Sequence, residues 1–395
     1  MSDRLSVVVL GMAGSAPFAG VAWQTLHYLE GLRRLGHDVV YLEDTERWPY
    51  DPVANSVSDD ATEAIAYVAR LAQRCGLTGR WAYRDVATGG TLHGLSERAL
   101  HQALAGADLL VNLSGATVLR EEHMRVPVRV YLETDPVLPQ IEVAQGREFT
   151  IALLDAHTHH FTYGENLGTP DCEVPVERYE YLPTRQPVVL DWWAPEGPPE
   201  AGGRPFTTVG NWRQTSKDVE WRGERYTWSK DVEFRRFLDL PRRVTWPLEL
   251  ALAIDDDATV AMLEDHGWTV RDALRMSGDV DRYRDYVRGS AGEFTVAKDQ
   301  NVRLRSGWFS DRTACYLAAG RPAIVQDTAF DAVLRTGEGL FAFGTPDEAA
   351  AAFDDVAAHY ARHSAAALAI AREYFDAESI LADLLDRAAA RRAPA

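Results

Sequence analysis

Three arginines lie close together in the chain, around a turn that precedes a predicted helix. Arg303 and Arg305 come before a Gly-Trp-Phe-Ser turn, and Arg312 follows it in the first turn of the helix. The free N–H groups at such a helix start bind anions, and guanidinium groups match phosphate oxygens. The segment therefore predicts a diphosphate site, although a helix cap at Ser310 and surface ion pairs would give the same pattern. The predicted site also includes Ser306, Gly307, Trp308, Ser310, Asp311, Asp327 and Thr328.

A pair of carboxylates forms a second candidate centre, in the segment Tyr131-Leu132-Glu133-Thr134-Asp135-Pro136. The pair follows a predicted strand, and the active sites of α/β sheets gather at the carboxyl ends of their strands. Asp135 is the first candidate for a general base and Glu133 the second.

Three histidines, His157, His159 and His160, form a further cluster. A strand would put the first two on one face and the third on the other, which disfavours joint binding of a metal ion. A hydrogen-bonded structural role, or substrate contact and general-base work by His157, are the remaining alternatives.

Composition and charge exclude several classes of protein. The 395 residues carry 41 Lys and Arg against 59 Asp and Glu, a net charge of −18 that disfavours nucleic acid and anionic membranes as partners. The three cysteines form no CxxC motif, so neither a disulfide framework nor a thiolate zinc site is predicted. The apolar run Val7 to Leu10 is too short for a signal peptide or a membrane span, and we expect a cytoplasmic protein.

Strands and helices alternate along the chain and would position these residues. This order predicts an α/β protein with two doubly wound domains, joined by a stretch rich in proline and glycine. The predicted divisions are a first domain at 1–182, a linker at 183–205, a second domain at 206–370, and a C-terminal helix and tail at 371–395. The predicted strands are 5–10, 39–42, 109–113, 128–132, 160–163, 205–209, 242–245, 294–297 and 323–326. The predicted helices are 21–35, 61–75, 95–104, 232–238, 260–266, 311–319, 346–363 and 365–388.

The motif Ala318-Ala319-Gly320-Arg321-Pro322-Ala323-Ile324-Val325 resembles the donor-binding half of GT-B glycosyltransferases, which has a small-residue helix, Gly-x-Pro and an apolar strand. The following Gly-Leu turn and acidic helix start, 336–349, resemble that family's next element. The small-residue loop after the first strand and the segment Leu35-Gly36-His37-Asp38-Val39 are similar to the acceptor half. The resemblance covers most of the chain.

The resemblance implies two Rossmann-like domains that face each other across a cleft, with the last helix crossing back to the first domain. It implies transfer of a sugar from a nucleoside-diphosphate sugar to a small-molecule or glycan acceptor, with no metal and no other cofactor required. Asp135 would be the base. By their positions, Asn211 in the turn after the first strand of the second domain and Lys230 before a helix would add donor contacts, although a turn-forming Asn and a solvated Lys fit the sequence equally well. Glu293 and Lys298 would add further donor contacts, and Gly14, Phe18 and Trp23 would form the acceptor wall.

The family's catalytic motifs are replaced in this chain. The glutamate pair of retaining members falls on Gly307 and Cys315, which favours inversion, and the phosphate-contacting histidine of plant-type inverting members falls on Arg305. An epimerase of nucleotide sugars with the same fold is one alternative. A sugar- or nucleotide-binding protein without catalysis is another. The loop Gly11 to Gly20 does not fit GxGxxG, so a nicotinamide oxidoreductase is disfavoured.

Overall fold

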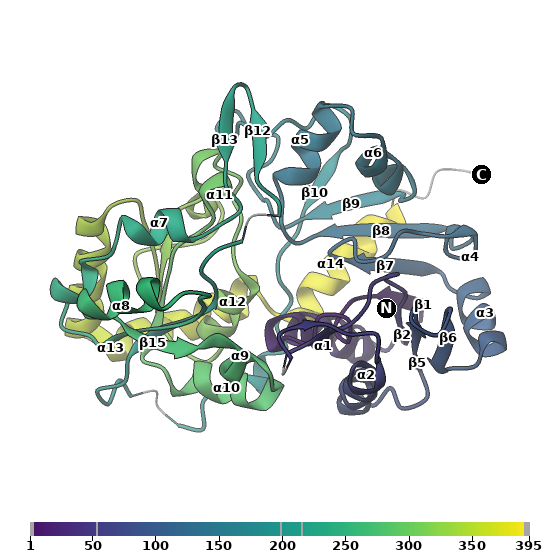
Figure 1. The fold of residues 1–395 in the computed structure, drawn as a ribbon, viewed down its shortest axis with the longest axis horizontal. Coiled ribbons are helices and arrows are strands. Elements are labelled where there is room, and N and C mark those ends of the chain that lie inside the picture. The colour runs from purple at the N-terminus through teal and green to yellow at the C-terminus, as the bar shows by residue number, and fades with distance from the viewer. Residues whose placement is uncertain (1–3, 53, 198–199, 215, 391–395) are drawn as a thin grey trace.

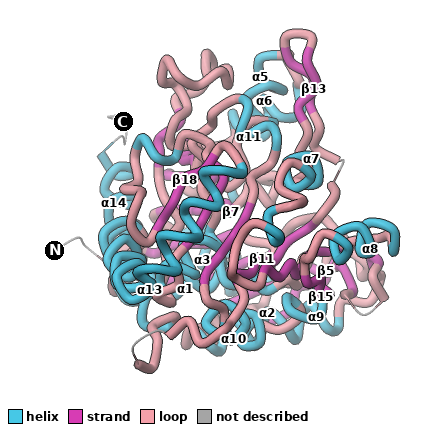
Figure 2. The backbone as a smooth tube through the Cα atoms, turned by 90° about the vertical axis from the view of Figure 1, so that its left-hand side faces the viewer, coloured by secondary structure: helices cyan, strands magenta, loops and turns pink. Residues whose placement is uncertain are grey.

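The computed structural model describes residues 4–52, 54–197, 200–214 and 216–390. Two α/β domains lie side by side (Figure 1), and Figure 2 shows helices on both sides of the strands. The predicted tail residues 391–395 and the linker positions 198 and 199 lie outside the described residues. Within the described residues, no helix is both long and apolar enough to cross a membrane.

The N-terminal domain is built on a sheet with the strand order β10-β9-β8-β7-β1-β2-β5-β6, in which only the β5–β6 pair is antiparallel. Its strands are β1 (Ser6–Leu10), β2 (Asp38–Glu43), β5 (Trp81–Asp85), β6 (Thr91–Gly94), β7 (Leu109–Leu113), β8 (Val128–Glu133), β9 (His159–Thr162) and β10 (Tyr181–Pro183), with a small hairpin of β3 (Tyr50–Asp51) and β4 (Ser56–Val57). Its helices are α1 (Ala19–Arg34), α2 (Thr62–Arg74), α3 (Glu97–Ala105), α4 (Glu121–Met124), α5 (Leu138–Ala144) and α6 (Glu148–Asp155).

The C-terminal domain has an all-parallel sheet with the order β15-β14-β11-β16-β17-β18. The strands are β11 (Phe206–Asn211), β14 (Leu248–Ala253), β15 (Thr269–Asp272), β16 (Gly292–Thr295), β17 (Ala323–Gln326) and β18 (Leu340–Phe343), with a hairpin of β12 (Val219–Trp221) and β13 (Glu224–Tyr226). The helices are α7 (Asp231–Arg235), α8 (Asp257–Asp265), α9 (Ala273–Ser277), α10 (Val280–Gly289), α11 (Asp299–Arg303), α12 (Asp311–Ala318) and α13 (Pro346–Tyr374), and α14 (Ala377–Ala390) follows them in the chain.

Strand β1 shows why each sheet is covered on both faces. Val7 and Val9 join the core under α1 and α2, whereas Val8 and Leu10 join the core under α3. Because successive side chains of a strand point to opposite faces, a continuous apolar run is buried only between two helical layers. The predicted doubly wound architecture is confirmed.

One predicted strand is wrong. Arg242 ends a 3-10 turn that begins at Leu240, and the strand of that region, β14, begins at Leu248 directly after Pro247. The proline lacks an N–H to donate to a sheet, so the strand starts after it. The sequence interpretation also missed β5, β15 and β18, which are short or lie near a sheet edge.

The last helix returns to the N-terminal domain, as Figure 1 shows for the yellow α14. Helix α14 packs against α1, and Leu381 of α14 lies so close to Gly31 of α1 that position 31 has no room for a side chain. The Val188 N–H also donates to the Phe375 carbonyl, 2.7 Å away. The chain therefore passes between the domains twice.

Candidate active site

A cavity of about 360 Å³ lies between the two domains. It is formed at the carboxyl ends of β7 and β8 in one sheet and of β11 and β14 in the other, together with the start of α12. This is where parallel α/β sheets bind their ligands. The polar side chains that line it are Gln24, Ser114, Thr134, Asp135, Asn211, Gln214, Trp228, Ser277, Tyr283, Lys298, Trp308, Ser310, Asp311 and Arg312.

Arg312 is the central cation of the C-terminal wall. Its guanidinium donates to Glu293 at 2.5 Å, to the Val209 carbonyl at 2.6 Å and to Thr295 at 3.0 Å. The Glu293 side chain is fully buried, and its second carboxylate oxygen has no hydrogen-bond partner within the described residues. Arg312 is thereby held rigidly at the first turn of α12.

Lys230 lies beside Arg312, because the Lys230 ammonium also donates to the Thr295 hydroxyl, at 3.3 Å. Lys230 has no ion pair with any carboxylate of the described chain, and burial together with Arg312 lowers its pKa well below the ordinary value. Because burial and the neighbouring guanidinium both oppose the charge of Lys230, an anionic ligand beside it would be stabilising.

Asp135 connects the two domains across the cavity. It accepts hydrogen bonds from the Lys298 ammonium, at 2.7 and 2.8 Å, and from the Trp228 indole N–H. Burial raises the pKa of Asp135, but Lys298 and Lys217 outweigh that effect and hold the pKa below its ordinary value. The carboxylate is therefore ionised at neutral pH, the state that a proton acceptor needs.

The turn before α12 also spans the domains. The Trp308 indole N–H donates to the Thr134 carbonyl at 2.9 Å, and Gly307 has a φ of 74°. A Cβ on Gly307 would lie 2.4 Å from the Asn166 backbone nitrogen. Ser310 occupies the N-cap position, but its side chain makes no capping hydrogen bond. The Ser310 side chain thus does not cap the first-turn N–H groups of α12.

Several predicted donor residues lie outside this cavity. Arg303 contacts Glu224 and Asp299, and Arg305 pairs with Asp171 at 2.8 Å and with Asp327 at 3.5 Å. These carboxylates satisfy both guanidinium groups.

Two hydroxyl residues of the predicted set are used inside the fold instead. Ser306 is buried and donates to Asn301, and the Thr328 hydroxyl donates to the Trp308 carbonyl. Of the three clustered arginines, Arg312 alone lines the cavity.

Glu133 and His157 do not line the cavity either. The Glu133 carboxylate is buried and accepts hydrogen bonds from Gln140 and Thr162. His157 follows helix α6 rather than lying in a strand, with Nδ1 2.8 Å from the Leu153 carbonyl and Nε2 3.1 Å from Asn112. Burial lowers the pKa of His157 to about 4. The strand geometry that we expected for the histidine cluster is wrong at His157.

The three predicted acceptor residues have different positions. Phe18 lines the cavity. The Gly14 N–H donates to the buried Glu43 carboxylate at 2.5 Å, which fixes the loop that carries Phe18. Trp23 is buried, and its indole N–H donates to the Val280 carbonyl of the other domain at 2.9 Å. Trp23 therefore contributes to the contact between the two domains.

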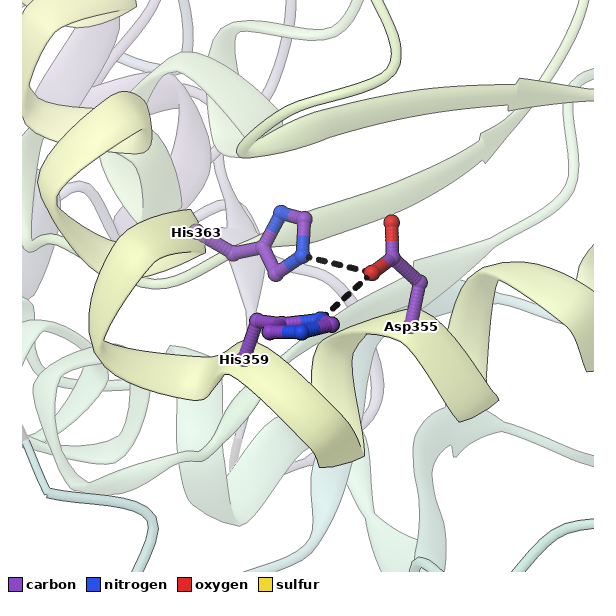
Figure 3. A group of neighbouring side chains, drawn as sticks. All are labelled: Asp355, His359 and His363. Atoms are coloured by element: carbon purple, nitrogen blue, oxygen red, sulfur yellow. Dashed lines mark hydrogen bonds and ion pairs between the residues drawn. The ribbon is translucent and has the colours of Figure 1, made fainter.

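Two groups of side chains in the described chain have metal-ligand types close together, and neither lines the cavity. Figure 3 shows the first, Asp355, His359 and His363 on α13, where both histidines point at one Asp355 oxygen. The Gly339 N–H donates to His363 Nδ1, and Arg362 donates to the same Asp355 oxygen at 3.0 Å. The second group is Asp44, Glu122 and His123, whose carboxylates are bonded to Arg120. Arginine already supplies the positive charge in both groups.

The sequence interpretation missed several cavity residues. Gln214 follows β11 and Trp228 follows the β12–β13 hairpin, whereas Gln24, Ser114 and Tyr283 come from elements without a motif. One signal was available at Lys217, a further cation after β11, which lies 3.7 Å from Asp135.

Comparison of the sequence with protein-family models and with curated proteins gives no match. Comparison with solved structures gives many. AviGT4, described as a glycosyltransferase involved in avilamycin A biosynthesis, matches with a TM-score of 0.52 at 12% identity, covering 99% of each chain. An alpha-glucosyltransferase solved with UDP and a 13-mer DNA matches at 0.57 and 9% identity, and Anabaena HepE with UDP and glucose at 0.56 and 11%. Both of these matches cover 98% of this chain and 100% of the other.

The chain has the GT-B fold. The matches extend over both domains and the returning helix, so the whole GT-B architecture is present. The cavity described above lies in the interdomain cleft of this fold.

Proposed function

We propose that the protein is a glycosyltransferase that uses a nucleoside-diphosphate sugar, held by the C-terminal domain, and an acceptor held against the N-terminal domain. The observation that carries the proposal is a group of three cations: Arg312 and Lys298 line the cavity, where Lys298 contacts Asp135, and Lys230 lies beside Arg312 at Thr295. UDP in the neighbouring structures supports a nucleotide donor.

The cations fit the chemistry of the leaving group. When the bond between the sugar carbon and the phosphate oxygen breaks, negative charge develops on the diphosphate. Fixed guanidinium and ammonium groups and the N–H groups at the start of α12 stabilise that charge without reorganising. Because these groups supply positive charge themselves, we propose that no metal ion is needed.

Asp135 fits the role of the base. In the proposed step the acceptor hydroxyl oxygen forms a bond to the sugar carbon, the nucleoside diphosphate leaves, and the hydroxyl proton passes to the Asp135 carboxylate. With Gly307 and Cys315 in place of the retaining family members' glutamates, we propose inversion at the sugar carbon.

The first test is nucleotide binding, by thermal shift against UDP, dTDP, GDP and CDP with and without magnesium. A ligand that binds only the folded state raises its stability as its concentration rises. We expect one diphosphate to raise the melting temperature without magnesium, and the matching nucleotide sugar to yield a transfer product when acceptors are added.

The variant for this test is Arg312→Ala combined with Glu293→Gln, because Arg312→Ala alone leaves a buried unpaired carboxylate. Arg305→Ala, an arginine outside the cavity, is the control. We expect the nucleotide no longer to raise the melting temperature of the double variant, and still to raise that of the Arg305→Ala control. An equal shift in both variants would contradict the donor site, and conversion of the sugar without an acceptor would indicate an epimerase.

A further inference from the structure

The turn that carries Asp135 contains a strained residue. Val137, two residues after Asp135, has φ 96° and ψ −61° and is completely buried. A β-branched residue at positive φ is a true conformational outlier, and such strain persists only where the surroundings hold it in place.

Glu133 and Gln140 hold this turn. The Val137 N–H donates to the Gln140 side-chain oxygen at 2.7 Å, and the Gln140 amide nitrogen donates to both Glu133 carboxylate oxygens, at 2.7 and 2.8 Å. Thr162 of the adjacent strand β9 donates to Glu133 at 2.6 Å. Glu133 and Gln140 are 2% and 1% exposed. The network is thus shielded from water, where such hydrogen bonds are strongest.

The network encloses Asp135 along the chain. Glu133 is the last residue of β8, and Val137 is the N-cap of α5, so a clamped position lies two residues on either side of Asp135. Across the cavity Asp135 meets Trp228 and Lys298 of the other domain. Its carboxylate therefore keeps its place only while both sides of the contact are fixed.

We propose that Glu133 is a positioning residue, which holds the turn 133–137 through Gln140 and so aims the Asp135 carboxylate into the cavity. This inference rests on the proposed function for the catalytic role of Asp135, but the position of the Asp135 carboxylate can be tested separately. Burial raises the pKa of Glu133 to about 7, whereas Lys298 and Lys217 hold the pKa of Asp135 below its ordinary value, so the two carboxylates lie in different environments.

The first readout does not depend on activity. The Trp228 indole N–H donates to Asp135, so its NMR resonance, assigned with Trp228→Phe, reports the place of the carboxylate. We expect Glu133→Gln to shift this resonance, because an amide cannot accept both Gln140 N–H bonds. The double variant Glu133→Gln with Gln140→Glu restores a donor–acceptor pair and should return the resonance to its wild-type position. Ser364→Ala, which removes a buried hydrogen bond to Gly320, is the control for general destabilisation.

The second readout is transfer. A misplacement of about 1 Å costs about 10²-fold in rate, so Glu133→Gln should lower kcat by about that factor while nucleotide affinity stays at the wild-type value. The double variant should recover most of kcat. An unmoved Trp228 resonance with an unchanged kcat in Glu133→Gln would overturn the inference.

Two further outcomes separate the two proposals. If the wild-type protein neither binds nucleotides nor transfers sugar, the proposed function fails, and the Trp228 resonance still decides whether Glu133 positions Asp135. If Glu133→Gln does not fold, the double variant decides alone, since a shifted resonance in a folded double variant contradicts the network.

Discussion

Replacing Asp135 by asparagine should strengthen nucleotide binding while it slows transfer. Asparagine keeps the size of the side chain and an oxygen for the Trp228 N–H, but it removes the negative charge that would share the Lys298 ammonium with a bound phosphate. The Lys298 ammonium lies 2.7 Å from Asp135, and a phosphate oxygen on its other side would lie about 5–6 Å from the carboxylate.

The size of the effect follows from these distances. Two unit charges about 5 Å apart interact by about 3 kcal/mol at an effective dielectric constant of about 20. The Asp135 side chain is 18% exposed and the cavity is open to water, so we reduce this repulsion to about 1–2 kcal/mol. Nucleotide affinity should therefore rise about 5- to 30-fold in Asp135→Asn. Loss of a general base should lower kcat by about 10²- to 10⁴-fold.

The assay is calorimetric titration with the nucleoside diphosphate found by thermal shift, beside steady-state transfer with its sugar. Glu142→Gln, on α5 and outside the cavity, controls for the change in net charge. Tighter binding with little transfer is the expected pair of results. Weaker binding would refute the electrostatic argument, and transfer at the wild-type rate would refute Asp135 as the base.

Three further changes test other parts of the structure. Lys230→Met should not lower the free energy of unfolding, because it removes a buried amine without a carboxylate partner. It should nevertheless weaken nucleotide binding by about 10-fold or more, through loss of a charged contact of about 1.5–3 kcal/mol. Chemical denaturation measures the stability and calorimetry the binding, and a large loss of stability would contradict the first expectation. Burial raises the pKa of Glu133 from 4.5 to about 7, so the native state binds a proton more tightly than the unfolded chain does. The stability of the wild type relative to Glu133→Gln should therefore fall by about 3 kcal/mol as the pH rises from about 4.5 to about 7, and should stay constant above about pH 7. Urea denaturation across this range measures the stability difference, and a difference that does not vary with pH would show that the pKa of this carboxyl is not perturbed. Gly307→Ala should lower the melting temperature, because residue 307 has a positive φ and the Cβ of an alanine there would meet the Asn166 backbone. The backbone conformation alone should cost about 1–2 kcal/mol. The matched control is Gly223→Ala, since Gly223 also has a positive φ but has open space around it.

Much of the fold could be predicted because it depends on local patterns. The apolar runs of β1, β7, β8 and β17 and the small-residue end of α12 are visible within short windows. Short edge strands such as β15 carry charged residues and were missed, since an edge strand needs little apolar surface.

The site was predicted less well, because contacts distant in sequence decide it. Asp135 and Arg312 have recognisable positions at strand and helix ends, and the structure places both at the cavity. Arg303 and Arg305 look equivalent to Arg312 in sequence, but carboxylates from other segments, Glu224 and Asp171, contact them outside the cavity. Trp228 reaches Asp135 across 93 residues. Neither spacing nor residue type reveals such pairings.

The return of α14 to α1 also affects how this chain folds during synthesis. Leu381, Leu384 and Leu385 of α14 complete the core beside α1, so the N-terminal domain lacks part of its own interior until residues 377–390 have left the ribosome. Domains generally fold in the order in which they emerge, but here the N-terminal domain must wait for a helix that follows the C-terminal domain. We therefore expect a nascent chain that ends after the first sheet to expose the apolar side of α1 and to need chaperone protection, and the C-terminal domain to acquire its stable structure no later than the N-terminal one.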